Sequence, residues 1–251
     1  MPIITVSSFK GGTAKTSSSL NLGAALALFH DQNVLLIDFD AQANLTAGLG
    51  YDPDAQESLA PVLQGKKRIE EVILSTNYPK LSLIAADTWL ERVEVTQALA
   101  ADRYSHEKLR DLLKPLKQFD TIIIDTPPSL CWLTESALIA SQFALIAATP
   151  EFYSVKGLQR LSQFLESLGT RHSLEVLGVI LSFWNPRGKS NDAFLEVIEE
   201  TFPGKMLKTK IRRDVAVSES SIYGKSIFDT APKSRAAQDF IKLSSELLQR
   251  L

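Results

Sequence analysis

Short apolar runs alternate with longer stretches of helical periodicity along this chain. The runs are rich in β-branched and aliphatic residues and lie at positions 3–6, 34–37, 81–85, 121–124, 144–148 and 176–181. Most are continuous instead of alternating with polar residues, which is typical of strands buried on both faces of a parallel sheet. Between the runs, apolar residues recur at helical spacing, as at Leu158, Leu161, Leu165 and Leu168. The pattern predicts a doubly wound α/β fold with a mostly parallel sheet.

The first helical stretch has an unusual composition. Residues 17–29 contain no charged side chain and consist mainly of Ala, Leu, Gly, Ser and Asn. A helix on the surface of a globular protein carries charges on its outer face. We therefore predict that protein covers this helix on most sides. Because no repeat, low-complexity tract or Pro/Ser-rich linker interrupts the pattern, we predict a single domain over residues 1–251.

Composition narrows the classes of protein that this chain can represent. Of 251 residues, 45% are hydrophobic and 22% charged, which is typical of a globular protein. The formal net charge is -2, so binding to nucleic acid requires a local basic patch. The single cysteine, Cys131, excludes an internal disulfide and fits a cytosolic setting. We expect neither a signal peptide nor a membrane-spanning helix, because no suitably long apolar stretch occurs.

A glycine-rich segment follows the first predicted strand and leads into the uncharged helix. Residues 10–17 read K-G-G-T-A-K-T-S, and a strand before and a helix after are the setting that a phosphate-binding loop requires. Glycines let backbone N–H groups turn towards an anion, and the helix N-terminus adds partial positive charge. Lys15 can reach the β- and γ-phosphates, and the Thr16 hydroxyl can bind Mg²⁺. The alternative is a glycine-rich turn with two surface lysines.

Carboxylates follow two further predicted strands. Residues 38–46 read D-F-D-A-Q-A-N-L-T and residues 121–128 read T-I-I-I-D-T-P-P. In open α/β sheets, ligands bind at the carboxyl edge, where these aspartates lie. Asp38 and Asp40 share one face of an extended strand. Asp125 after an aliphatic run indicates a Walker B aspartate, which holds Mg²⁺. One such segment is a weak signal, whereas three in order strongly predict a nucleotide site.

The three segments resemble the motifs of the ParA/MinD family of P-loop ATPases. Residues 10–16 resemble its variant Walker A motif, K-G-G-x-G-K-[ST], and residues 38–44 and 125–128 are similar to its D-x-D-x-Q-x-N and D-T-P-P motifs. The resemblance extends to D-T-A-P-K-S-R at 229–235 and is best to the short, Soj-like ParA proteins. This chain departs from the motif at Ala14, where the family has glycine. A Cβ there would crowd the phosphates or strain a positive φ, and so bears on nucleotide affinity and turnover.

The resemblance implies the site residues and the cofactors, ATP and Mg²⁺. It implies a nucleotide sandwich dimer in which Lys10 of one copy reaches the nucleotide of the other. Lys10, Lys15 and Asp40 would be catalytic, with Asp40 acting on the attacking water. Thr16, Asp38 and Asp125 would hold the metal, and Asn185 would contact the adenine. The nucleotide would be bound by Lys10, Gly11, Gly12, Thr13, Ala14, Lys15, Thr16, Ser17 and Asn185.

The resemblance also implies a biological role. Short ParA proteins are ATP-dependent partition ATPases for chromosomes or plasmids, with slow hydrolysis that a ParB-like partner stimulates. They bind double-stranded DNA non-specifically. We therefore expect a cytoplasmic protein that associates with the nucleoid when ATP is bound.

Basic residues gather in one part of the chain. Residues 205–213 contain five basic residues and no acidic one. If this stretch is extended, Lys208, Lys210 and Arg212 share one face, which would bind phosphates without reading sequence. The resemblance assigns DNA binding to Arg187 and Arg213, and a solvated charged face is the alternative. The predicted DNA-binding residues are Arg187, Lys189, Lys208, Lys210, Arg212 and Arg213.

Three other functions share the nucleotide motifs. A MinD-like membrane regulator ends in a basic amphipathic helix, whereas residues 239–251 carry mixed charges and predict a docked core helix. We therefore expect no membrane partner. A synthetase of small-molecule metabolism would not need Lys10. The third alternative is a scaffold that binds ATP without hydrolysing it, because Ala14 in the phosphate loop bears on turnover.

Overall fold

An eight-stranded sheet runs through the centre of the molecule. The computed structural model describes residues 1–8, 10–90, 105–150, 154–170, 172–188 and 191–251. The strand order is β3-β4-β2-β5-β1-β6-β7-β8. The strands are β1 (Ile3–Ser7), β2 (Val34–Asp38), β3 (Ile73–Ser75), β4 (Leu81–Ile84), β5 (Thr121–Asp125), β6 (Phe143–Ala148), β7 (Glu175–Trp184) and β8 (Met206–Arg212).

The sheet is parallel except at one edge, which confirms the predicted fold class. Only the pair β3–β4 is antiparallel among the described strands. Five of the six predicted apolar runs lie within strands, and the sixth, 81–85, extends one residue beyond β4, to Ala85 in an isolated bridge with Ser58. The short strand β3 was not predicted, because its three residues are half-buried or exposed and give no long apolar run. The basic stretch at 206–212 is extended, as the edge strand β8.

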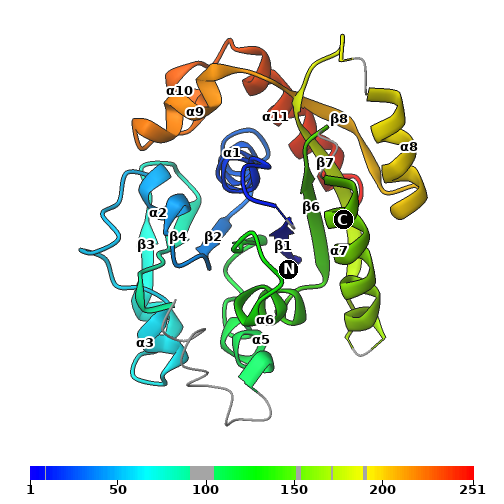
Figure 1. The fold of residues 1–251 in the computed structure, drawn as a ribbon. Coiled ribbons are helices and arrows are strands. Elements are labelled where there is room, and N and C mark those ends of the chain that lie inside the picture. Colours follow the sequence, from blue (N-terminus) through cyan, green and yellow to red (C-terminus); the bar gives the residue numbers. More distant parts are fainter. Residues whose placement is uncertain (9, 91–104, 151–153, 171, 189–190) are drawn as a thin grey trace.

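Helices cover both faces of the sheet (Figure 1). One face is covered by α1 and α11, with α2, α9 and α10 beside them, and the other by α3 and α5–α8. The helices are α1 (Lys15–Phe29), α2 (Asn44–Gly48), α3 (Ala60–Leu63), η1 (Ile69–Val72), η2 (Ser105–Glu107), α5 (Lys108–Leu113), α6 (Trp132–Ala140), α7 (Ser154–Gly169), α8 (Asn191–Thr201), α9 (Val215–Ile222), α10 (Ile227–Thr230) and α11 (Arg235–Leu248).

Helix α1 is enclosed by protein, as its uncharged composition predicted. It packs on the sheet and contacts α2, α9 and α11. Gly23 lies so close to the sheet that an added Cβ would be 2.7 Å from Leu36 Cδ2. The helix that follows the phosphate loop is therefore held on several sides, which positions its N-terminus firmly.

The C-terminal helix α11 docks on the protein. Its apolar residues Phe240, Leu243 and Leu247 are buried in the core that also contains α1, which confirms the predicted docked helix. Over the ranges that the structure describes, no helix is both long and apolar enough to span a lipid bilayer.

Candidate nucleotide site

The three motif-bearing strands are neighbours in the sheet. β5 lies between β1 and β2, and Asp38 is the register partner of Asp125. Because all three strands are parallel, their carboxyl ends meet at one edge of the sheet. Strand β1 ends there at Ser7, and α1 begins there at Lys15. The topology thus brings together three segments that are far apart in sequence.

Asp125 is the centre of a buried hydrogen-bond cluster. Lys15 Nζ lies 3.1 Å from Asp125 Oδ1, and Thr16 Oγ1 donates to Oδ2 at 2.7 Å. Ser19 Oγ donates to Oδ1 at 2.8 Å. Asp125 is fully buried and Lys15 is 6% exposed, so each charge requires its partner. Sequence reasoning missed Ser19, although its position four residues after Lys15 places both on one helix face.

Asp38 lies beside this cluster and is also fully buried. Its Oδ2 accepts hydrogen bonds from the amide and the hydroxyl of Thr46, at 2.8 and 2.7 Å. Burial, reinforced by the adjacent Asp125 carboxylate, raises the pKa of Asp38 to about 7. Thr46 closes the second motif, but the sequence alone assigned it no role. A neighbouring cation would favour the ionised form of Asp38.

A cavity of about 400 Å³ opens at the phosphate loop. A Cβ placed on Gly11 or Gly12 would meet no atom within 4 Å, and Gly12 has a φ of 79°. The backbone of this loop therefore faces open space that can accept an anion. The cavity is lined by Ser8, Lys10, Gly11, Gly12, Thr13, Ala14, Lys15, Thr16, Ser17, Asp40, Gln42, Asn44, Pro128 and Ser221.

Several cavity residues were predicted and several were not. Asp40, 6% exposed, accepts a hydrogen bond from the Gln42 amide at 3.0 Å on its Oδ1. Gln42 and Asn44 belong to the second motif but had no predicted role. Ser221 comes from the distant helix α9, and no signal in the sequence points to it.

Ala14 adopts a left-handed conformation. Its φ and ψ are 58° and 28°, and it is the N-cap of α1. Its carbonyl accepts the first helical hydrogen bond, from Ser18 N at 2.8 Å. An L-residue with a Cβ pays about 1–2 kcal/mol for this region, whereas glycine does not. The strain that the sequence predicted at this position is therefore present.

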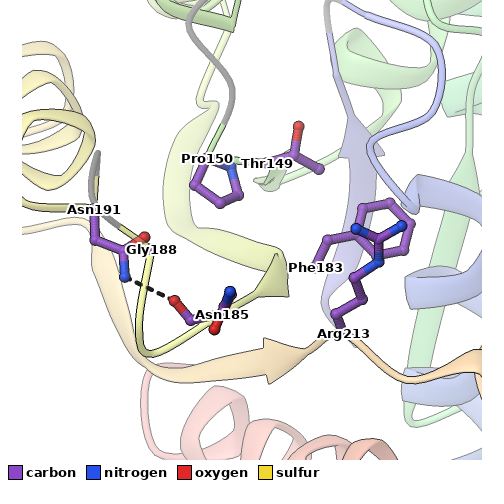
Figure 2. A pocket seen from close by; sticks show the side chains of 7 residues that line it. All are labelled: Thr149, Pro150, Phe183, Asn185, Gly188, Asn191 and Arg213. Carbon is purple, nitrogen blue, oxygen red and sulfur yellow. Dashed lines mark hydrogen bonds between the residues drawn. The ribbon is translucent and has the colours of Figure 1, made fainter.

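A second cavity, of about 340 Å³, lies near the ends of β7 and β8 (Figure 2). Asn185, the residue expected at the adenine, lines it, and its carbonyl accepts a hydrogen bond from Asn191 Nδ2 at 2.8 Å. Phe183 and Arg213 line the same cavity. The sequence analysis predicted that Arg213 binds DNA. In the structure Arg213 lines the same cavity as Asn185.

The other basic residues have different surroundings. Arg212 makes a bidentate contact with the Asp239 carboxylate. Its Nε donates to Oδ2 at 2.8 Å and its Nη2 donates to Oδ1 at 2.7 Å. This hydrogen bonding raises the pKa of the Arg212 guanidinium. Lys210 Nζ lies 4.2 Å from the centroid of a Trp184 ring. Arg187 and Lys208 are exposed, and Lys189 lies outside the described residues.

Comparison with known proteins decides the family. A family model described as an AAA domain matches residues 1–176. A ParA family protein of Chlamydia muridarum is 66% identical over 249 residues, which is 99% of this chain and 98% of that protein. The sporulation initiation inhibitor protein Soj of Bacillus subtilis is 34% identical over 250 residues, 98% and 97% of the two chains. The chain belongs to the ParA/MinD family.

Two solved structures similar to this ParA/MinD-family chain contain a nucleotide and magnesium. The septum site-determining protein MinD of Pyrococcus horikoshii, complexed with Mg-ADP, has a TM-score of 0.81 and 29% identity over 98% of this chain and 95% of that one. Cobyrinic acid a,c-diamide synthase of Mycobacterium smegmatis, with ADP and magnesium, has a TM-score of 0.86 and 26% identity over 99% and 94%. The fold is therefore that of a ParA-type P-loop ATPase.

The residues of this chain fit magnesium and a nucleotide. Mg²⁺ prefers oxygen ligands and is held by one or two carboxylates together with phosphates. Asp38, Asp125 and the Thr16 hydroxyl supply such oxygens within one cluster. Gly11, Gly12 and Lys15 line the cavity at the phosphate loop, before and at the N-terminus of α1, which suits the phosphates.

Proposed function

We propose that this chain is a Mg²⁺-dependent partition ATPase that dimerises around ATP, binds DNA without sequence preference and is stimulated by a ParB-like partner. The observation that carries the proposal is that Lys10, Lys15 and Asp40 line one cavity at the phosphate loop. The similarity to ParA and Soj proteins over nearly the whole chain supports it.

The buried lysine would exchange partners when nucleotide binds. Lys15 Nζ now neutralises Asp125, at 3.1 Å. In the proposed site Asp38, Asp125 and the Thr16 hydroxyl would hold Mg²⁺, which would supply positive charge to the carboxylates and to the phosphate oxygens. The ammonium group of Lys15 would then bind the phosphates, while Thr16 and Asp125 would bind the metal ion. Positioning and charge neutralisation of this kind supply most of the catalysis in phosphoryl transfer.

Asp40 would orient the attacking water in the proposed reaction. It lies on the cavity wall, and the Gln42 amide fixes one of its oxygens. Lys10, the first residue of the phosphate loop, lines the same cavity as Asp40. In the proposed dimer, Lys10 reaches across to the nucleotide of the second copy. Hydrolysis would then depend on dimerisation, in the manner of an arginine finger supplied in trans.

DNA binding would rest on exposed basic residues. Arg187 is exposed, and Lys208 projects from the edge strand β8. Arg212 is held by Asp239, so we assign it a smaller share of DNA binding. Arg213 lines the second cavity but is exposed, so it stays among the proposed DNA contacts. Contacts of this kind bind phosphates and weaken steeply with salt.

A scaffold that binds ATP without turnover is the second candidate, because of the strained Ala14. The experiment is ATP turnover with random duplex DNA, with a ParB-like partner, and with both, using Lys15→Ala as the inactive control. We expect turnover to rise at least tenfold when both are present. Tight ATP binding with turnover at the Lys15→Ala level in every condition would support the scaffold. Consumption of ATP that requires a carboxylate substrate would support a synthetase.

A further inference from the structure

Three side chains of α1 donate to the two oxygens of Asp125, and they differ in their access to the nucleotide cavity. Lys15 and Ser19 donate to Oδ1, at 3.1 and 2.8 Å, and Thr16 donates to Oδ2 at 2.7 Å. Lys15 and Thr16 line the cavity, whereas Ser19 is fully buried and is not among the cavity-lining residues that the structure describes. A ligand in the cavity can therefore contact Lys15 and Thr16 but not Ser19.

Ligand binding would leave Ser19 as the remaining donor of these three to Asp125. In the proposed site Lys15 binds the phosphates and the Thr16 hydroxyl binds Mg²⁺. Asp125 Oδ1 would then keep the hydrogen bond from Ser19, whose helix is held by the sheet and by α2, α9 and α11. This bond matters because a buried carboxylate oxygen that loses every donor bears the full cost of its desolvation.

The Ser19 hydroxyl has two acceptors within reach and one proton to donate. Its Oγ lies 2.8 Å from Asp125 Oδ1 and 3.1 Å from the Lys15 carbonyl oxygen. The shorter distance and the charge of the carboxylate both favour Asp125, because hydrogen bonds to ionised acceptors are shorter and stronger than neutral ones. Ser19 therefore fixes one oxygen of this carboxylate from within the protein.

The second carboxylate of the proposed metal site is held in the same way. Asp38 Oδ2 accepts a hydrogen bond from the Thr46 hydroxyl at 2.7 Å, and that hydroxyl accepts one from the Ala86 amide at 3.1 Å. Thr46 is fully buried and, like Ser19, is not among the cavity-lining residues of the described chain. Each carboxylate is thus oriented by a hydroxyl that a bound ligand does not contact.

We propose that Ser19 is a positioning residue for Mg²⁺: its hydroxyl holds Asp125 Oδ1 and leaves Oδ2, the oxygen that Thr16 contacts, for the metal ion. The inference rests on the proposed Mg²⁺-dependent function and names a residue that acts through Asp125. A carboxylate that turns about its side chain exchanges its two oxygens. Without the Ser19 hydroxyl, Asp125 can turn once Lys15 has moved to the phosphates, so the affinity for Mg²⁺ decreases.

The test measures the affinity for Mg²⁺ of the ADP complex in wild type, Ser19→Ala and the matched control Ser18→Ala. Ser18 is the preceding serine of α1; it is fully buried, and its hydroxyl has no hydrogen-bond partner among the described residues. Anisotropy of a fluorescent ADP, in EDTA and in a Mg²⁺ titration, gives the affinities for ADP and for Mg²⁺.

We expect Ser19→Ala to lower the affinity for Mg²⁺ about tenfold, the order of one hydrogen bond to a charged group. Its affinity for ADP in EDTA should stay close to that of wild type, because no metal ion then depends on the orientation of Asp125. Ser18→Ala should bind Mg²⁺ like wild type. Ser19→Cys keeps the shape of the side chain but offers a weaker donor, so it should lower the affinity for Mg²⁺ in the same direction. This variant also serves if Ser19→Ala does not fold.

Several outcomes overturn the inference, and they are distinguishable from failure of the proposed function. Wild-type affinity for Mg²⁺ in Ser19→Ala or in Ser19→Cys would show that the hydrogen bond does not position Asp125, while the proposed function stands. Equal losses of ADP affinity with and without Mg²⁺ would show that Ser19 only supports the phosphate loop. Binding of ADP to wild type that does not depend on Mg²⁺ would remove both the inference and the Mg²⁺-dependent function. Because ADP binding needs no turnover, a wild type that responds to Mg²⁺ but does not hydrolyse ATP would reject the ATPase alone.

Discussion

Asp38 and Asp125 occupy the same register on neighbouring parallel strands, so two buried carboxylates lie side by side in the nucleotide site. One cation, Lys15, contacts Asp125 and none of the described hydrogen bonds of Asp38 comes from a cation. The pair therefore carries more negative charge than its surroundings neutralise. Such an arrangement favours a divalent cation and disfavours the empty, fully ionised site.

The stability of the metal-free protein should fall as the pH rises from about 4 to 7. Asp38 ionises near 3.8 in the unfolded chain and near 7 in the folded protein. Between these values the folded protein keeps a proton that the unfolded chain has lost, so the free energy of unfolding decreases with pH. The loss is complete above pH 7. Urea unfolding at pH 5 and pH 8 without Mg²⁺ measures it.

Asp38→Asn should remove this dependence. The asparagine oxygen can still accept from Thr46, whereas no charge is buried beside Asp125. We expect the variant to exceed wild type in unfolding free energy by at least about 1 kcal/mol at pH 8, since one pKa unit corresponds to about 1.4 kcal/mol. Its affinity for Mg²⁺ with nucleotide should decrease. Equal pH slopes in the two proteins would contradict this account of Asp38.

Ala14→Gly should stabilise the protein. Glycine removes the cost of the left-handed conformation at the start of α1 but adds entropy to the unfolded chain, so we expect a net gain of about 0.5–1 kcal/mol. Ala14→Val, which is β-branched, should destabilise it. Chemical denaturation checks both, and Ala43→Gly is a matched control at another left-handed N-cap. A loss of stability in Ala14→Gly would show that the backbone there is unstrained.

Lys15→Ala should lower both stability and turnover. It leaves the buried Asp125 carboxylate with hydrogen bonds from Thr16 and Ser19 but without a countercharge. Removing one partner of a buried pair costs about 3–5 kcal/mol, and the two hydroxyls should hold the loss near the lower end. Turnover should decrease at least a hundredfold. Lys66→Ala, an exposed lysine outside the cavity, is the control for both assays.

Arg187 and Arg212 should respond differently to substitution. Arg212→Ala removes the bidentate contact with the Asp239 carboxylate, so we expect a loss of about 1–3 kcal/mol in unfolding free energy. Arg187→Ala should leave stability unchanged, weaken DNA binding uniformly across sequences and reduce the salt slope by about 1. Fluorescence anisotropy with random duplexes at several salt concentrations measures this. Unchanged DNA affinity in Arg187→Ala would remove this residue from the proposed DNA contacts.

Much of the fold could be predicted because its signals are local. The six apolar runs, the uncharged residues 17–29 and the apolar spacing in residues 239–251 each report burial of the segment that contains them. Strand β3 was missed because three half-exposed edge residues produce no such signal. The phosphate loop and the aspartates at the strand ends were found for a similar reason, since each motif is contiguous in sequence.

The sequence by itself determined the fold class, the family and the residues of the three nucleotide motifs, because these depend on patterns within short stretches of chain. The tertiary structure alone decided that Asp38 neighbours Asp125, that Ser19 and Ser221 join the site, and that Arg212 pairs with Asp239. It also showed that Arg213 and Asn185 line the same cavity. It showed as well that Val215, Ile222 and Tyr223 are exposed to solvent. Contacts of this kind arise from strand order and helix packing, which bring together residues that no local pattern connects.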